Sequence, residues 1–300
     1  SSVFKKWRTS KANWLYAMYI ETFDYTIYTK KKGLKILADI YENPYIFKEL
    51  ADEVQQQPEL RCISHLKEDF MAQYDLRMQY IDQLLETADQ YLIPSNYVMQ
   101  SLQQNSVYFN IKKVNIIPYV SSVTNEKYNN TPIKGRIIWI GNDPVRKGLV
   151  YLLRAFNILR KRYTYIDCRI IGPMPKEIIE SNYFTGFTFL GYLNKEQLKE
   201  ELRLADMYVF PTLSEGFAGS LLEAASFGVP IITTKASGFS DDFSGIFIAE
   251  KNAEDIVKSV TFLLENREIR NKISKDIFSY AQKYDKDNFE KKLITLLKTK

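Results

Sequence analysis

The second half of the chain alternates short apolar runs with longer segments in which apolar residues recur every three or four positions. In residues 148–162, for example, Leu149, Leu152, Phe156 and Leu159 place one apolar stripe along a helix. Strands that alternate with such helices are typical of a parallel sheet covered by helices on both faces. We therefore predict strands at 136–141, 166–172, 188–190, 207–210, 230–234 and 246–249, and helices at 148–162, 175–182, 195–205, 219–227 and 253–265.

The same pattern is weaker in the first half of the chain. It predicts strands at 34–40, 90–95 and 115–120, helices at 13–31 and 70–88, a polar linker at 121–134 and a last helix at 287–298. We predict an α/β protein with two Rossmann-like domains, residues 1–124 and 133–284, and a C-terminal helical segment, 285–300, that packs back toward the first domain. A complete domain of this kind has about five or six strands. We therefore expect that a segment upstream of Ser1 has been removed or is supplied by another chain.

The composition is that of an ordinary globular protein, with 45% hydrophobic and 26% charged residues. No uncharged apolar run reaches the ~18 residues that suggest a membrane span. Residues 1–35 carry eight basic and only two acidic residues, with Trp7 and Trp14 among them. This basic segment fits a solvated helix face, and it also fits peripheral contact with an anionic membrane surface. No recognition motif accompanies the charge, so we expect no nucleic-acid binding.

Cysteine and histidine are scarce, since Cys62, Cys168 and His65 are the only ones. Two cysteines in a chain of 300 residues do not form a disulfide framework, which favours a reducing cytoplasm. Cys62 and His65 are close in sequence, but a zinc site needs three or four protein ligands. We therefore predict no metal site, and we place the protein in the cytoplasm, where its basic segment would allow contact with the inner face of the membrane.

The most informative stretch is Glu215-Gly-Phe-Ala-Gly-Ser-Leu-Leu-Glu223, which puts two carboxylates eight positions apart. It lies between a predicted strand and a predicted helix, at the sheet edge where α/β proteins bind ligands and where a helix N-terminus offers N–H groups to phosphate. Glu215 also fits a helix cap, because carboxylates stabilise helix N-termini. Glu223 lies between Leu222 and Ala224, and a buried carboxylate is costly unless it is paired or hydrogen-bonded. This cost favours a binding role for Glu223.

A second motif, Gly141-Asn-Asp-Pro-Val-Arg146-Lys147-Gly148, lies at the first strand-to-helix junction of the second domain. The ammonium of Lys147 and the free N–H groups of the helix start would together suit a diphosphate. The alternative is an exposed base in a turn. The position of this motif upstream of the glutamate pair favours the diphosphate.

Together these motifs resemble those of retaining GT-B glycosyltransferases of family 4 type, the glycosyl transferases group 1. The glutamate pair resembles the E-x7-E motif of that family, and residues 141–148 resemble its G-R-x-x-x-x-K-G segment, with Asn142 in place of the arginine. Residues 171–173, 189–191 and 116–118 also resemble family segments. The resemblance implies a GT-B fold, in which two Rossmann-like domains face each other across a cleft.

The resemblance also implies roles for individual residues. The second domain would bind a nucleotide-sugar donor: Glu223 would bind the ribose hydroxyls, and Glu215 would face the transferred sugar. Lys147, with Arg146 replacing the missing arginine, would stabilise the leaving diphosphate without a metal. The remaining donor-binding candidates are Gly141 and Asn142 of the second motif and the backbone N–H groups of Gly216, Phe217, Ala218 and Gly219.

The acceptor side departs further from the family pattern. Many members have a histidine in an H-D or H-E pair after a strand, and the comparable residues here are Asp39-Ile-Tyr41-Glu42. Tyr41 would then take the place of the histidine, and we name Tyr41 and Glu42 as candidate acceptor-side residues. His65 lies in a polar helical stretch, and we interpret it as a surface or structural residue.

We therefore predict a retaining, metal-independent glycosyltransferase of hexosyltransferase type that acts in polysaccharide biosynthesis. It would move a sugar from a nucleotide-sugar, with a UDP-sugar favoured, to a saccharide or lipid-linked acceptor, and no cofactor is expected. The alternative is a catalytically inactive nucleotide-sugar-binding partner or regulatory pseudoenzyme, which Asn142, Tyr41 and the short first domain motivate. A nucleotide-sugar epimerase of the same architecture fits the glutamate pair less well.

Overall fold

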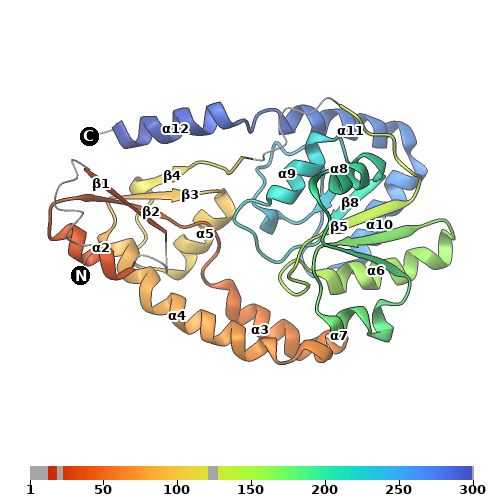
Figure 1. Ribbon diagram of the computed structural model, residues 1–300, viewed down its shortest axis with the longest axis horizontal. Helices are drawn as coiled ribbons and strands as arrows, with labels where there is room; N and C mark the ends of the chain where they lie inside the picture. Colours follow the sequence, from red (N-terminus) through yellow and green to blue (C-terminus); the bar gives the residue numbers. More distant parts are fainter. Residues whose placement is uncertain (1–12, 19–22, 121–127, 299–300) are drawn as a thin grey trace.

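The computed structural model describes residues 13–18, 23–120 and 128–298, which form two parallel sheets lying one beside the other along the molecule (Figure 1). The first sheet has the order β1-β2-β3-β4, with β1 (Trp14–Met18), β2 (Lys35–Asp39), β3 (Gln90–Ile93) and β4 (Val114–Ile116). The second has the order β10-β9-β8-β5-β6-β7, with β5 (Arg136–Ile140), β6 (Asp167–Ile171), β7 (Phe187–Gly191), β8 (Met207–Phe210), β9 (Ile231–Thr233) and β10 (Ile246–Phe247). The predicted α/β fold with two Rossmann-like halves is confirmed.

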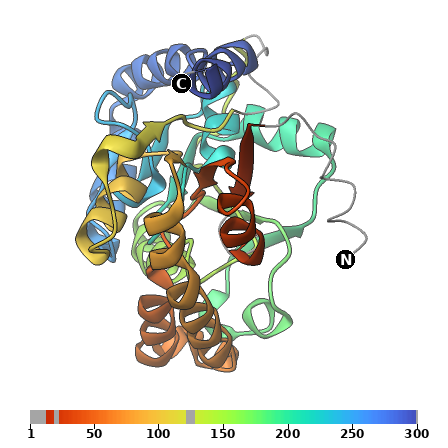
Figure 2. The same ribbon diagram turned by 90° about the vertical axis from the view of Figure 1, so that its left-hand side faces the viewer.

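Alternating side chains of the first sheet form two separate apolar layers, as the period of two in a strand requires. Ile36, Ala38 and Ile93 pack with residues of α4 (Leu66–Thr87) and α5 (Asn96–Asn105). Leu37 and Leu92 point to the other face, where they pack with Leu296 of α12 (Lys286–Lys298). Figure 2 shows α12 and α4 on opposite sides of this sheet, so the C-terminal helix covers the first half of the chain.

The second sheet is covered by α6 (Leu149–Arg162), α7 (Lys176–Ile179), α8 (Lys195–Leu204), α9 (Gly219–Ser226), α10 (Ala253–Glu265) and α11 (Arg267–Ala281). Short 3-10 helices lie at η1 (Pro58–Ile63), η2 (Ile111–Lys113), η3 (Asn182–Phe184) and η4 (Lys235–Ser237). In the described ranges, none of the helices has the length and apolar character that crossing a membrane requires.

One helix of the first half, α3 (Ile46–Gln56), packs against the second half. Its residues Leu50 and Val54 belong to the same buried cluster as the second sheet. Tyr151 of α6 donates a hydrogen bond to Glu53 of α3 at 2.6 Å, and Arg154 of α6 forms an ion pair with Glu59 of η1 at 2.7 Å. The two halves are therefore joined through α3 and η1 as well as through the connection to α12.

The prediction of one helix over 13–31 is wrong. Residues 14–18 form strand β1, in which Leu15 and Ala17 point inward while Tyr16 and Met18 are exposed. Among the described residues of this range, the helix is limited to Phe23–Lys30, α2. The alternation lets β1 pair with β2, so the first sheet has four strands rather than the three predicted.

Other boundaries also differ from the prediction. Strand β4 ends at Ile116 rather than at residue 120, and Pro118, which has no N–H to donate, follows soon after. The region predicted as one helix over 175–182 contains the shorter α7 followed by η3. Helices α3, α5 and α11 were not predicted. Residues 121–127 of the predicted linker and residues 1–12 of the basic segment lie outside the described residues.

A buried ionic group anchors β8, the strand that leads to the Glu215 loop. The carboxylate of Asp206, which precedes β8, accepts hydrogen bonds from Arg267 at 2.8 Å and from Arg270 at 3.0 Å. The N–H of Gly135 donates to the other oxygen at 2.9 Å. Asp206 and Arg270 are 0% and 1% exposed, so neither charge is satisfied by water. Helix α11 is thus held to the start of β8.

We predict that Asp206→Asn lowers the free energy of unfolding by roughly 3 kcal/mol, because it leaves two buried or half-buried guanidinium groups without their counter-charge. The measurement is urea denaturation of both proteins. The matched control is Asp276→Asn, which removes an exposed ion pair to Lys272 and should cost less than about 1 kcal/mol. Equal losses in the two variants would contradict the structural role given to Asp206.

Candidate active site

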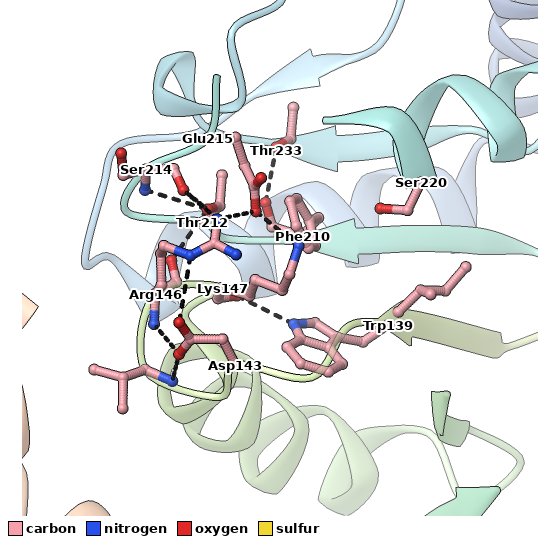
Figure 3. A network of polar contacts seen from close by, with 12 residues as sticks. Trp139, Asp143, Arg146, Lys147, Phe210, Thr212, Ser214, Glu215, Ser220 and Thr233 are labelled. Carbon is pink, nitrogen blue, oxygen red and sulfur yellow. Dashed lines mark hydrogen bonds and ion pairs between the residues drawn. The ribbon is translucent and has the colours of Figure 1, made fainter. Parts of the chain in front are cut away.

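The two sequence motifs meet because β5 and β8 are neighbours in the second sheet. Both strands are parallel, so the loops that follow them, residues 141–148 and 211–218, leave the same edge of the sheet. Figure 3 shows Arg146 and Lys147 from the first loop pointing toward Glu215 of the second. The predicted catalytic residues are therefore adjacent.

Glu215 forms ion pairs with both bases through one oxygen. Lys147 Nζ donates to Glu215 Oε1 at 2.7 Å, and Arg146 Nη1 lies 2.8 Å from the same atom. Arg146 also donates through Nη1 to the carbonyl oxygen of Ser214 at 3.0 Å and pairs through Nε with Asp143 at 3.3 Å. Among the described residues, no hydrogen bond reaches Glu215 Oε2, so this oxygen can accept one from another partner.

Burial and charge act against each other in this group. Burial favours the neutral form of Glu215, but the charges of Lys147 and Arg146 outweigh it and hold the pKa of the carboxyl below its ordinary value of 4.5. Burial lowers the pKa of the Lys147 ammonium, against the attraction of Glu215. The pKa of Arg146 is raised by Glu215 and Asp143 in spite of burial. The lowered pKa of Glu215 and the raised pKa of Arg146 both favour the charged forms of this ion pair.

The local sequence explains why the bases take these positions. A Cβ atom on Gly141 would lie 2.3 Å from Cδ of Lys147, so only glycine leaves room for the lysine side chain to cross the end of β5. The carboxylate of Asp143 accepts hydrogen bonds from the N–H groups of Val145 and Arg146, at 3.1 and 2.9 Å, which shapes the turn. Asn142 is exposed, and its side chain makes no hydrogen bond to the described residues. Arg146, and not residue 142, brings the second positive charge to Lys147.

Glu215 is not a helix cap. Helix α9 begins at Gly219, and its N-cap residue Ala218 makes no side-chain capping bond. The carboxylate of Glu215 is instead directed at the two bases of the other loop.

Glu223 lies on α9 and is half-buried. Within the part of the chain that is described, its carboxylate has no hydrogen bond and no ion pair, and burial raises its pKa, with only a distant opposing effect of Lys195. A partly desolvated carboxylate without a partner is costly. Donor groups of a ligand would lower that cost, as the sequence argument expects.

The loop between the glutamates is only partly available for ligand binding. The N–H of Ala218 donates to the carbonyl oxygen of Ser237 at 3.0 Å, so this N–H is already paired within the protein. Gly216, Phe217 and Gly219 have no such partner among the described residues. Phe217 is 6% exposed and packs edge-on against Phe239, with ring centres 4.8 Å apart. This side chain anchors the loop while leaving its N–H groups unpaired.

The acceptor-side candidates lie against the same loop. A Cβ atom on Gly216 would lie 1.8 Å from the carbonyl oxygen of Tyr41, so the close approach of the two chain segments requires glycine. Glu42 forms an ion pair with Arg77 of α4 at 2.8 Å. Tyr41 is thereby placed beside the Glu215 loop, whereas His65 is exposed at the start of α4 and is not part of this group.

Two tyrosines near the site were not identified from the sequence. The hydroxyl of Tyr97 donates to the carbonyl oxygen of Leu213 at 3.1 Å, which joins α5 to the Glu215 loop. The hydroxyl of Tyr208 accepts from the N–H of Ile140 at 3.2 Å and contacts Ser220 Oγ at 3.0 Å, so it ties the end of β5 to the start of α9. A tyrosine within the apolar run of β8 was the available signal for this contact.

Comparisons with known proteins agree with this architecture. The family model for glycosyl transferases group 1 matches residues 123–279, just over half of the chain. An uncharacterised glycosyltransferase of Methanocaldococcus jannaschii is 28% identical over 175 residues, which are 54% of this chain and 44% of that protein. An N,N'-diacetylbacillosaminyl-diphospho-undecaprenol alpha-1,3-N-acetylgalactosaminyltransferase of Campylobacter jejuni is 26% identical over 199 residues, 64% of this chain and 52% of that protein. The chain spans about half the length of these curated relatives.

Among solved structures, that of the Anabaena protein HepE in complex with UDP resembles this one with a TM-score of 0.71 at 12% identity. The similarity covers 99% of this chain and 82% of that protein. At this level of identity it is the fold that is shared, and the predicted GT-B fold is confirmed.

We predict that Lys147→Met raises the pKa of Glu215, because the carboxyl stays buried but loses one of its two cations. A carboxyl whose folded pKa is depressed adds stability at pH values above its unfolded pKa of ~4.3, and this stability is lost as the pH falls through the folded pKa. Acid unfolding of the variant should therefore begin at a higher pH.

The titration can be followed by carbon-13 NMR of labelled glutamate carboxyls. Asn142→Ala, a change at an exposed neighbour in the same loop, should leave the Glu215 titration unchanged. If Lys147→Met also left it unchanged, the ion pair would not be present in solution.

Proposed function

The chain belongs to the glycosyl transferases group 1 family, and on this premise we propose that it is a retaining glycosyltransferase of family 4 type. It would move a hexose from a nucleotide-sugar donor to a saccharide or lipid-linked acceptor. The observation that carries the proposal is the pairing of Arg146 and Lys147 with one oxygen of Glu215 at the ends of β5 and β8. That edge is where α/β folds bind nucleotides.

The donor would lie across the start of α9. Glu223, half-buried and without a partner among the described residues, would accept hydrogen bonds from the ribose hydroxyls. The unpaired N–H groups of Gly216 and Gly219 would point to the phosphates, at a helix N-terminus that favours anions. A uridine nucleotide is the proposed donor, because HepE, which shares the fold, was solved with UDP bound.

Charge stabilisation would supply most of the rate enhancement. As the bond between the sugar and the diphosphate breaks, negative charge develops on the leaving group, and Lys147 and Arg146 would stabilise it. In other enzymes, removing one hydrogen-bond donor that stabilises developing negative charge costs about 2.7–4 kcal/mol of transition-state stabilisation. Glu215 holds both cations through Oε1, which would leave Oε2 to orient a sugar hydroxyl. No metal enters this proposal, so a chelator should leave activity unchanged.

The acceptor would enter beside Tyr41 and Glu42, which lie next to Gly216. The name of the Campylobacter relative describes a transferase acting on a diphospho-undecaprenol substrate, which supports a lipid-linked acceptor as one option. We also propose action in the cytoplasm. The exposed bases Lys30, Lys31 and Lys32 at the end of α2 would favour contact with an anionic membrane surface.

We predict that Glu223→Ala weakens nucleotide binding, whereas Glu215→Ala lowers turnover more than it alters nucleotide affinity. Thermal shift with UDP-, GDP- and ADP-sugars measures the first effect. A ligand at 100 times its dissociation constant adds ~2.7 kcal/mol, a shift of very roughly 5–10 °C for a domain of this size. Release of sugar from the donor measures the second. Equal and small effects of both substitutions would contradict the assignment, and binding without any turnover would favour the pseudoenzyme.

As the pH is lowered, nucleotide affinity should begin to fall at a higher pH than it would if Glu223 had the ordinary pKa of a glutamate. Burial raises the pKa of Glu223 above 4.5, so the carboxyl takes up its proton at a higher pH and then no longer accepts two hydrogen bonds. Titration calorimetry with UDP across the acidic range measures this dependence. Glu223→Gln should bind more weakly and should lose the dependence on pH. The same pH profile in both proteins would exclude Glu223 as its origin.

A further inference from the structure

A polar groove lies beside the Glu215 loop but outside the Glu215 group. It has a volume of 290 Å³ and lies between one side of α5, which is labelled in Figure 1, and the chain segment that leads from β2 to α3. Amide and hydroxyl side chains form most of its wall, and they come from Asn43, Tyr97, Gln100, Ser101, Gln104 and Asn105.

The residues of α5 that line the groove lie on a different face of the helix from Val98 and Leu102. Tyr97, Gln100, Ser101 and Gln104 recur every three or four positions and therefore share one face of the helix. Val98 and Leu102 point instead into the apolar layer of the first sheet. Gln100 and Gln104 are exposed, and neither belongs to a buried apolar cluster.

Part of the wall is held in place by hydrogen bonds. Asn43 Oδ1 accepts from the N–H of Tyr45 at 3.0 Å and from the hydroxyl of Ser101, and Asn43 Nδ2 donates to the Tyr97 hydroxyl at 3.3 Å. Tyr97 in turn donates to the carbonyl oxygen of Leu213. One end of the groove is thus joined to the Glu215 loop by a fixed tyrosine.

The amides of Gln100 and Gln104 are uncommitted. In the part of the chain that is described, neither makes a hydrogen bond to protein. Each amide offers an oxygen acceptor and two N–H donors. Together with the ordered Asn43 and Tyr97, they give the groove both donors and acceptors.

The charge of the groove limits the class of ligand. Of the described residues that line the groove, Glu49 alone is charged, and it forms an ion pair with Lys251 at 2.7 Å. No base is among these lining residues, so a phosphate-bearing chain would find no counter-charge from them. An acyl chain would leave the amides and hydroxyls without partners. A neutral chain of hydroxyl groups satisfies donors and acceptors alike.

We infer that this groove binds a neutral oligosaccharide and holds the part of the acceptor that lies away from the reacting hydroxyl. The inference that the bound chain is the acceptor rests on the proposed function. The groove begins at Asn43, directly after the candidate acceptor-side residues Tyr41 and Glu42, so one saccharide chain extends from the Gly216 contact along α5. The preferred acceptor is then an oligosaccharide rather than a monosaccharide or a phosphate polymer.

The test is titration of the protein with maltotetraose, cellotetraose, chitotetraose and mannotetraose, in which saturation-transfer NMR measures the binding of each sugar. At least one of the four should bind, and the double variant Gln100→Ala/Gln104→Ala should weaken its binding about tenfold, as expected for the loss of one or two hydrogen bonds. Gln103→Ala changes an exposed glutamine of α5 that does not line the groove, and it should bind like the wild type.

Three results would overturn the inference: no tetrasaccharide binds, the double variant binds like Gln103→Ala, or poly(glycerol phosphate) displaces the bound sugar. A thermal shift with UDP on the same samples keeps the two proposals apart. A shift with UDP and no tetrasaccharide binding refutes the groove alone. Tetrasaccharide binding at the groove without any nucleotide shift refutes the donor site alone.

Discussion

The ion pairs between Glu215 and the bases Lys147 and Arg146 determine the geometry of the whole site. Their side chains are 12%, 12% and 20% exposed, so water satisfies little of their charge. With Asp143 beside Arg146, the group contains two positive and two negative side chains. Because a buried charge that loses its partner is strongly destabilising, each of the loops after β5 and β8 fixes the position of the other. The site therefore forms where the loops after these two neighbouring strands meet, and neither motif forms it alone.

The contact between the two halves follows from the same loop. Gly216 comes directly after Glu215 and approaches the carbonyl oxygen of Tyr41 so closely that a side chain could not fit. Tyr97 adds a hydrogen bond from α5 to Leu213, and α3 adds buried contacts with α6. Residues that carry the proposed acceptor functions are thus held beside those that carry the proposed donor functions. The groove along α5 continues from this contact.

The sequence predicted the parts of the structure that depend on local pattern. Strand β8 and helix α10 were predicted at their exact residues, because apolar spacing alone defines them. Both motifs were predicted at strand-to-helix junctions, and the carboxyl ends of the strands in a parallel sheet share one edge. Strand β1 was missed because all five of its residues, Trp14–Met18, are apolar, so the alternation of buried and exposed side chains cannot be seen in the sequence.

Contacts between distant segments could not be predicted in this way. The hydrogen bond from Tyr97 to Leu213 joins residues 116 positions apart, and no local sequence pattern near either residue predicts it. The hydrogen bond from the Ala218 N–H to the carbonyl oxygen of Ser237 depends on how η4 folds over the loop. The sharing of Glu215 Oε1 by two bases likewise follows from side-chain geometry, whereas the sequence identified only the three residues.

The most direct test of the account is the anomeric form of the sugar that the protein first releases from a donor when water is the acceptor. Proton NMR during the first minutes of reaction with UDP-α-glucose or another accepted UDP-α-sugar distinguishes the two anomers before they interconvert. Retention predicts that the α-anomer appears first, and that Glu215→Ala and Lys147→Met both slow its release. Initial release of the β-anomer would contradict the proposed mechanism, and release at the wild-type rate by both variants would contradict the role of the Glu215 ion pairs.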